Sequence, residues 1–253
     1  MLQSANKTKS LALGASDGRI GHVEEFYFDD SHWTLRYLVA QAGNWLTGRM
    51  VLLSPHVLEK PDEKHKLLPV DLTREQIRNS PSPETDEPVS RKFEESYYQY
   101  YGWPYYWSGP YLWGPSPFPM QPPGPMESAE ARLVMPPGDP RSGDPHLRST
   151  DEVTGYHLRA RDGEIGHVQD FLYDDGDWSI RYLVVDTRNW WPGKQVLIPP
   201  SWIGEIHWKD RMVDVDAMRE DIRRAPAYDP DQPITLALEM QLARYYDPDL
   251  HKV

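Results

Sequence analysis

The segment from Asp17 to Pro81 reappears without a gap as Asp162 to Pro226, and 28 of the 65 paired positions are identical. The offset between the two copies is constant at 145 residues. Because ungapped identity preserves loop lengths as well as strands, both copies must bury their apolar residues in the same geometry. The chain is therefore expected to contain one folding unit twice.

The composition limits what these units can be. A chain of 253 residues has room for two domains of roughly 100 residues and a connector. Cysteine is absent, which excludes a disulfide framework, a thiolate metal site and a thiol nucleophile. Apolar residues make up only 39% of the chain, whereas Trp, Tyr and Phe together make up 12%, so the sequence favours two small cores that rely on aromatic side chains.

The net charge of -12 argues against a nucleic-acid partner, because such affinity depends on Lys and Arg displacing counterions from phosphates. The apolar run near the amino terminus, 11–13, is far shorter than the apolar region of a secretory signal, and no stretch approaches the length of a membrane-spanning helix. We therefore expect a cytoplasmic protein without membrane insertion.

Each copy reads as a series of short strands. Asp17-Gly18 and its counterpart Asp162-Gly163 are hairpin signals, because glycine accepts the positive φ of a tight turn. Gly21 and Gly166 then predict a bulge or a sharp bend within the next strand. The pattern Trp-x-x-Arg-Tyr-Leu-Val, starting at Trp33 in the first copy, indicates the central strand.

Six short antiparallel strands would leave unpaired edges, and closure into a small barrel removes them. Helix-compatible residues follow the strands at 71–79 and 216–224, where Thr73 and Gln76 indicate a capping box that the second copy lacks. Apolar stripes predict terminal helices at 90–101 and 235–246. The expected fold is mainly β: two small antiparallel barrels, each followed by short helices.

The repeated pattern Asp-Gly-x-Ile-Gly-x-Val-x-x-Phe, the central strand, and the apolar strand ending in Ser-Pro or Pro-Pro together resemble the PRC-barrel family. The resemblance covers residues 17–81 and 162–226. It implies a β-barrel that serves assembly and protein contact, with no catalytic residues or cofactor to carry over.

Residues 102–150 form a connector between a first unit at 1–101 and a second at 151–253, and they hold 12 of the 25 prolines. Such a density of proline excludes helix and central strand. Residues 97–118 hold 11 of the 30 aromatic residues, and an uncovered patch of that size is usually an interface. We therefore expect a homodimer; the alternative is that the segment wraps its own barrels and leaves a monomer.

Several polar residues are candidates for a binding site. His22 and His167 occupy the same repeat position near carboxylates and suggest a metal or acid–base site, although strand alternation favours a solvent-facing side chain. The carboxylates at 29–30 and 174–175 are explained by turn chemistry. Arg36 and Arg181 could bind an anion or stack on a ring, but an ion pair with the acidic turns is favoured.

Loop tryptophans either cover the barrel or anchor a contact, since Trp is enriched at interface hot spots. We hypothesise a non-catalytic protein-interaction or assembly module, not an enzyme, with unknown protein partners. The alternative is a small-ligand or metal-binding protein, and possibly an enzyme, with a site in the groove between the barrels near His22, His167 and the loop tryptophans. The candidate interaction surface comprises Trp45, Trp190, Trp191, Tyr97, Tyr101, Trp103, Trp107 and Trp113.

Overall fold

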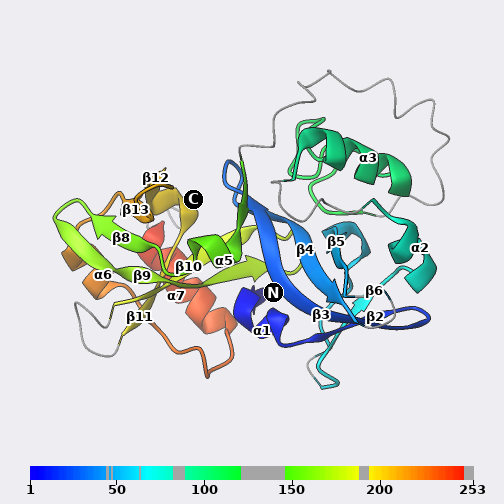
Figure 1. Ribbon diagram of the computed structural model, residues 1–253. Helices are drawn as coiled ribbons and strands as arrows, with labels where there is room; N and C mark the ends of the chain where they lie inside the picture. The colour runs from blue at the N-terminus through cyan, green and yellow to red at the C-terminus, as the bar shows by residue number, and fades with distance from the viewer. Residues whose placement is uncertain are drawn as a thin grey trace. The chain divides into compact units, whose positions relative to one another are not determined.

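The computed structural model (Figure 1) describes residues 1–43, 46, 48–62, 64–81, 89–120, 146–187 and 194–247. The chain divides into two compact units. Unit 1 comprises Met1–Asn6, Thr150–Asp174 and Ile180–Val253, and unit 2 comprises Lys7–Ser149 and Asp175–Ser179. Each unit thus includes a short segment from the other half of the chain, which a linear division at 101 and 150 does not contain.

Unit 2 contains one sheet, in the order β5-β4-β3-β2-β6, with β7 paired to β3. Its strands are β2 (Ala12–Ala15), β3 (Gly18–Asp29), β4 (Thr34–Ala42), β5 (Met50–Leu53), β6 (Leu67–Val70) and β7 (Leu147–Ser149). Its helices are α2 (Arg74–Asn79), α3 (Arg91–Tyr101) and the 3-10 turn η2 (Pro55–Val57), and α1 (Ala5–Lys9) precedes β2. The terminal helix expected at 90–101 is confirmed.

Unit 1 contains a sheet in the order β12-β13-β8-β9-β10-β11-β14, with β1 paired to β9. Its strands are β1 (Leu2–Ser4), β8 (His157–Ala160), β9 (Gly163–Asp174), β10 (Ile180–Asp186), β11 (Gln195–Ile198), β12 (Ile203–His207), β13 (Met212–Val215) and β14 (Ala227–Tyr228). Its helices are α5 (Thr150–Val153), α6 (Arg219–Arg224), α7 (Leu236–Tyr246) and the 3-10 turn η4 (Pro200–Trp202). The molecule is therefore mainly β, with short helices after each sheet, as the sequence predicts.

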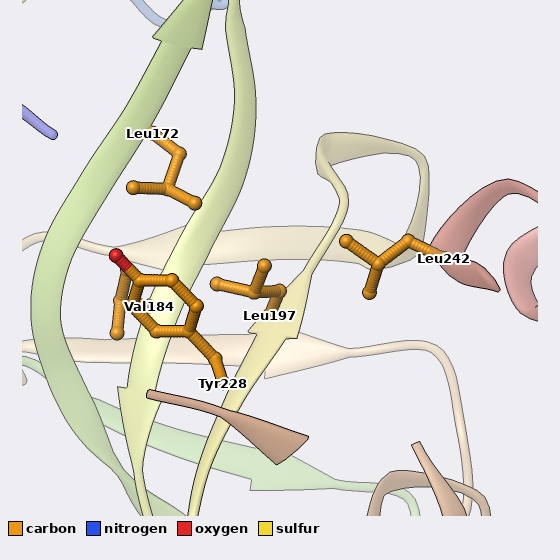
Figure 2. Close-up of a cluster of buried hydrophobic side chains, with 5 residues drawn as sticks. All are labelled: Leu172, Val184, Leu197, Tyr228 and Leu242. Carbon is orange, nitrogen blue, oxygen red and sulfur yellow. The ribbon is translucent and has the colours of Figure 1, made fainter. Parts of the chain in front are cut away.

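Leu242 of α7 anchors one part of the unit 1 core. Figure 2 shows its side chain beside residues from β9, β10, β11 and β14, namely Leu172, Val184, Leu197 and Tyr228. All five side chains are buried. Burying a leucine side chain of this kind stabilises a fold by roughly 1.5–3 kcal/mol, so α7 belongs to the core of unit 1.

Most strand pairs are antiparallel, but one pair in each sheet is parallel: β2 with β6, and β8 with β13. The prediction of antiparallel strands is therefore wrong at these two pairs. The cause is that the chain reverses direction an even number of times between the first and last strands of each copy. The last strand consequently runs in the same direction as the first strand beside it.

Gly21 and Gly166 stand where the backbones of two strands approach closely. In the β2–β3 ladder Leu13 pairs with Gly21 and Gly14 pairs with Arg19, which leaves Ile20 as the extra residue of a bulge. A Cβ atom on Gly21 would lie 1.9 Å from the carbonyl oxygen of Gln41. The bulge predicted from the sequence is confirmed, and glycine is required there because no side chain fits.

Edge strands β1 and β7 occupy the same position in the two sheets. Leu2 pairs with Asp174 in unit 1, and Leu147 pairs with Asp29 in unit 2. Serine hydroxyls hold both strands: Ser4 donates to Asp170 at 2.5 Å. Ser149 donates to Glu25. These contacts explain why residues 1–6 belong to the unit built from the second copy.

The capping box predicted at the start of α2 is present. Thr73 Oγ1 accepts from Gln76 N at 3.2 Å, and Gln76 Oε1 accepts from Thr73 N at 2.8 Å. At the corresponding start of α6, Asp221 accepts from Met218 N at 3.1 Å, which is half of such a box. No side-chain oxygen is available at Met218, so α6 lacks the other half.

We expect Thr73→Ala to lower the free energy of unfolding by about 1 kcal/mol, because the substitution removes the acceptor for an N-terminal amide of α2. Urea unfolding at neutral pH measures the change. Met218→Ala is the matched control and should change stability by less than about 0.5 kcal/mol. Equal effects of the two substitutions would contradict the assignment of the cap to Thr73.

Across the part of the chain that the structure describes, none of the helices combines the length and apolar character needed to span a bilayer.

Candidate interaction surface

Helix α3 packs on the sheet of unit 2 through two buried tyrosines, Tyr97 and Tyr98. The Tyr97 hydroxyl donates to the carbonyl oxygen of Leu52 at 2.9 Å and accepts from Ser54 N at 3.1 Å. Its ring meets Tyr37 of β4 edge to face, with centroids 5.6 Å apart. The helix ends at Gly102, which adopts a left-handed conformation with φ of 71° and turns the chain back.

Residues 103–118, which we call the aromatic segment, return along α3 after this turn. Tyr98 contacts the rings of Tyr105, Tyr106 and Trp107 with centroids 5.6–6.0 Å apart. Such ring pairs each contribute about 0.5–1.5 kcal/mol beyond their buried area. The first part of the expected connector is therefore part of the core of unit 2.

Arg36 of β4 lies at the centre of the contact with the aromatic segment and is only 1% exposed. Its guanidinium donates to Asp29 Oδ2 at 3.0 Å and to the carbonyl oxygen of Leu112 at 2.6 Å. The guanidinium carbon also lies 4.0 Å from the ring centroid of Tyr106 and 4.9 Å from that of Trp113. The predicted ion pair with an acidic turn residue is confirmed, and the ring stacking that the sequence left open occurs as well.

Both carboxylate oxygens of Asp29 take part in the hydrogen bonds that hold this arrangement. Its Oδ1 accepts from Ser31 N and His32 N, and its Oδ2 accepts from Arg36 and faces His32 Nδ1. Burial alone would raise the pKa of Asp29, but the charges and hydrogen bonds of Arg36 and His32 outweigh burial and hold the pKa below its usual value. Asp29 is therefore ionised and balances the buried arginine.

Glu94 of α3 is a second buried charge, with 0% of its surface exposed. Its Oε1 accepts from the hydroxyls of Tyr37 at 2.7 Å and Tyr106 at 3.0 Å. Its Oε2 lies 2.9 Å from Arg91 Nη1. Burial and the charge of Glu94 raise the pKa of Tyr37 well above its usual value, so both tyrosines act as hydrogen-bond donors.

His56 lies inside the aromatic cluster. Its ring stacks on Trp103 with centroids 4.8 Å apart and meets Trp113 edge to face at 5.1 Å. Its Nδ1 lies 2.9 Å from Ser54 Oγ. Burial, with a smaller contribution from the Arg36 charge, lowers the pKa of His56 to about 3, so the ring is neutral at pH 7.

A pocket of about 180 Å³ opens beside Arg36 within unit 2. Its lining combines two arginines, two histidines, three aromatic rings and the carboxylate of Asp29, both oxygens of which already accept hydrogen bonds. The lining residues are Asp29, Ser31, His32, Arg36, Arg91, Tyr106, Trp107, Gly109, Tyr111, Leu112 and His146. Neither His22 nor His167 is among them.

The candidate residues for an interaction surface fall into three groups. Tyr97, Trp103 and Trp113 are buried in unit 2, so they form its core and offer no surface. Tyr101 and Trp107 are partly exposed. Trp45, Trp190 and Trp191 lie outside the described residues.

The two candidate histidines lie on strands. His22 on β3 is exposed, as strand alternation predicts, with its Nε2 3.5 Å from Glu24 Oε2. His167 on β9 is partly buried and pairs with His157 of β8 in the ladder. Within the described ranges, no group of three or more His, Asp or Glu side chains is placed to hold a metal ion.

Sequence reasoning did not select Glu94 or His56. Glu94 could have been found from its counterpart Glu239, which occupies the same position in the second copy. His56 has serine at the paired position, Ser201, and so carried no repeat signal. Its burial depends on Trp103 and Trp113, which are 47 and 57 residues further along the chain.

Unit 1 carries the same face without the aromatic segment. Arg181, Tyr182 and Glu239 correspond to Arg36, Tyr37 and Glu94 at the offset of 145 residues. Among the described residues, Arg181 is exposed, whereas Tyr182 and Glu239 are partly exposed. Burial and the nearby charge of Glu239 raise the pKa of Tyr182.

Comparison with known families identifies the class of domain. Residues 151–222, which cover the sheet of unit 1 from α5 into α6, match the model of the PRC-barrel domain. The chain therefore carries a PRC-barrel domain, as its motifs predicted. A search of curated proteins finds no match to the chain.

Proposed function

We propose that the chain is a non-catalytic protein-interaction or assembly module. The supporting observation is that one face of the repeated unit, built from the central strand and the terminal helix, binds the aromatic segment in unit 2. The binding uses a buried arginine, a buried glutamate and stacked rings. Aromatic and arginine side chains in desolvated contacts are typical of interface hot spots.

Quantitative affinity capture from cells that make the protein tests this proposal. We expect a small set of proteins to be recovered in near-stoichiometric amounts with the intact chain. The cells are fractionated beforehand, so the experiment also tests the predicted cytoplasmic location. A stoichiometric metal or small molecule in the purified protein, together with no protein partner, would contradict the proposal.

A small-ligand role is the second candidate, and the pocket beside Arg36 is the observation that favours it. Its volume of about 180 Å³ suits only a small molecule. Arg36, Arg91, His32 and His146 line the pocket, and each also contacts a carboxylate of the chain, namely Asp29, Glu94 or Asp30. A small anion would therefore bind by sharing these donors. Calorimetric titration with inorganic phosphate and with acetate tests this role, and no heat of binding at millimolar concentration would reject it.

Homodimerisation remains a prediction of the proposed function, but the aromatic segment supports it less than its composition suggested. Four of the seven aromatic side chains in the segment are buried in unit 2, and its exposed aromatic side chains are Tyr111 and Phe118, followed by the exposed Met120. Sedimentation at micromolar concentration should give twice the chain mass of 29.4 kDa. The double variant Tyr111→Ser, Phe118→Ser should then sediment as a monomer, whereas a monomeric unmodified protein would refute the dimer.

A further inference from the structure

Each unit has a face that includes an arginine, a tyrosine and a glutamate at corresponding positions, and in unit 2 the aromatic segment covers this face. In unit 2 the face consists of Arg36, Tyr37 and Glu94, and the aromatic segment occupies it. In unit 1 the three corresponding residues are identical in type: Arg181, Tyr182 and Glu239. Arg36 and Glu94, which bond to the aromatic segment, therefore have counterparts of the same type in unit 1. Tyr98, Arg91 and His56, which also contact its rings, are replaced there by Ala243, Leu236 and Ser201.

Exposure shows that the second face is open. Arg36 is 1% exposed, whereas Arg181 at the paired position belongs to the exposed class. Glu94 is fully buried, whereas Glu239 is partly exposed. Within the described residues, Arg36 and Glu94 are covered by contacts with the aromatic segment, and unit 1 has no counterpart of that segment over Arg181 and Glu239.

The outer side of α7 differs from α3 in a way that suits aromatic rings. Leu236 stands where α3 has Arg91, and Met240 stands where α3 has Glu95. These side chains are 72% and 46% exposed and lie one helical turn apart. Trp107 covers Arg91 in unit 2, with 3.9 Å between the guanidinium carbon and the ring centroid, so a ring in the equivalent place on unit 1 would cover Leu236.

We propose that this open face of unit 1, formed by Arg181, Tyr182, Leu236, Glu239 and Met240, binds a Tyr/Trp- and Pro-rich segment of a partner protein. The inference rests on the proposed interaction function and identifies its surface and the chemistry of its partner. A partner ring covers Arg181, a partner carbonyl accepts from the guanidinium, and a partner tyrosine hydroxyl donates to Glu239. The apolar side of α7 receives a further ring.

The probe for this face is a synthetic peptide with the sequence of residues 102–116, because that segment already fits the equivalent face of unit 2. We expect saturable 1:1 binding of the labelled peptide to the full chain in fluorescence anisotropy. Glu239→Gln and Arg181→Ala should each weaken binding at least about tenfold, as expected when a partly buried charged hydrogen bond is lost. A scrambled peptide of the same composition should not saturate.

Matched controls separate this contact from general adhesion of aromatic peptides. Gln241→Ala alters an exposed position on α7 outside the open face and should leave affinity unchanged. A peptide with Phe in place of Tyr106 lacks the hydroxyl expected at Glu239. Its loss of affinity should therefore not add to the loss caused by Glu239→Gln. Circular dichroism of each variant confirms that the fold is retained.

Three results would overturn the inference. One is the absence of saturable binding up to about 1 mM peptide. Another is binding that Arg181→Ala and Glu239→Gln leave unchanged, because the peptide then binds elsewhere, for example by replacing the segment of unit 2. The third is a homodimer that Glu239→Gln converts to a monomer, because the occupant is then a second copy of this chain. If captured partners remain bound to the Arg181→Ala, Glu239→Gln variant, the interaction function stands and only this surface is wrong.

Discussion

Replacing Arg36 by methionine should lower the free energy of unfolding by about 3–5 kcal/mol, the cost typical of removing one partner of a buried ion pair. The substitution leaves Asp29 buried without its main countercharge and removes the donor to the carbonyl oxygen of Leu112. The guanidinium contacts with Tyr106 and Trp113 disappear as well. Urea unfolding at pH 7, followed by far-UV circular dichroism, measures the loss.

Arg181→Met is the matched control, because it makes the same chemical change at the paired position of the second copy. Since Arg181 is exposed, its replacement should cost less than about 0.5 kcal/mol. A loss below about 1 kcal/mol for Arg36→Met, or equal losses at both positions, would mean that water reaches Arg36 and that the aromatic segment does not cover it.

The features that the sequence predicted depend on residues close together in the chain. The bulge at Gly21 and the cap at Thr73 involve partners within a few positions or directly across a hairpin. The ion pair of Arg36 with Asp29 spans seven residues and joins two strands that a short turn must bring together. Turn and strand rules are sufficient for such contacts.

Long-range contacts could not be predicted in the same way. Arg36 donates to the carbonyl oxygen of Leu112, which is 76 residues away in the chain, and no periodic pattern in the sequence predicts this hydrogen bond. The density of proline at 102–150 indicated an irregular segment but not whether it lies inside or outside. Counting aromatic residues therefore suggested an exposed patch, whereas in unit 2 most of these rings pack against one another.

Residues at the same position in the two copies differ in exposure. Arg36 and Arg181 are both followed by Tyr-Leu-Val but have opposite exposure, and Glu94 is buried whereas Glu239 is partly exposed. In unit 2 residues 103–118 cover this face, and they belong to unit 2 alone. A shared motif therefore specifies the sheet, and the segment outside the motif decides whether its face is covered.

The buried imidazole of His56 gives the second large effect, a loss of stability in acid. Its pKa is about 3 in the folded protein and near 6.5 in the unfolded chain, so the unfolded state binds the proton first as the pH falls. The contribution of His56 is thus fully favourable above pH 6.5 and is lost progressively toward pH 3. From pH 7 to pH 4 this single group should cost about 3 kcal/mol.

Urea unfolding of the unmodified protein and of His56→Gln at pH 7, 6, 5 and 4 isolates this loss, because every other titrating group is common to both proteins. Asp29, with its lowered pKa, contributes in the same direction but mainly below about pH 4, and it cancels in the difference. The unmodified protein should lose about 3 kcal/mol more than the variant over this range, whatever stability the variant has at pH 7.

His22→Gln, which removes an exposed imidazole, is the control. Its loss of stability between pH 7 and pH 4 should be close to that of the unmodified protein. Parallel losses in the unmodified protein and His56→Gln would mean that His56 is hydrated and that Trp103 and Trp113 do not enclose it.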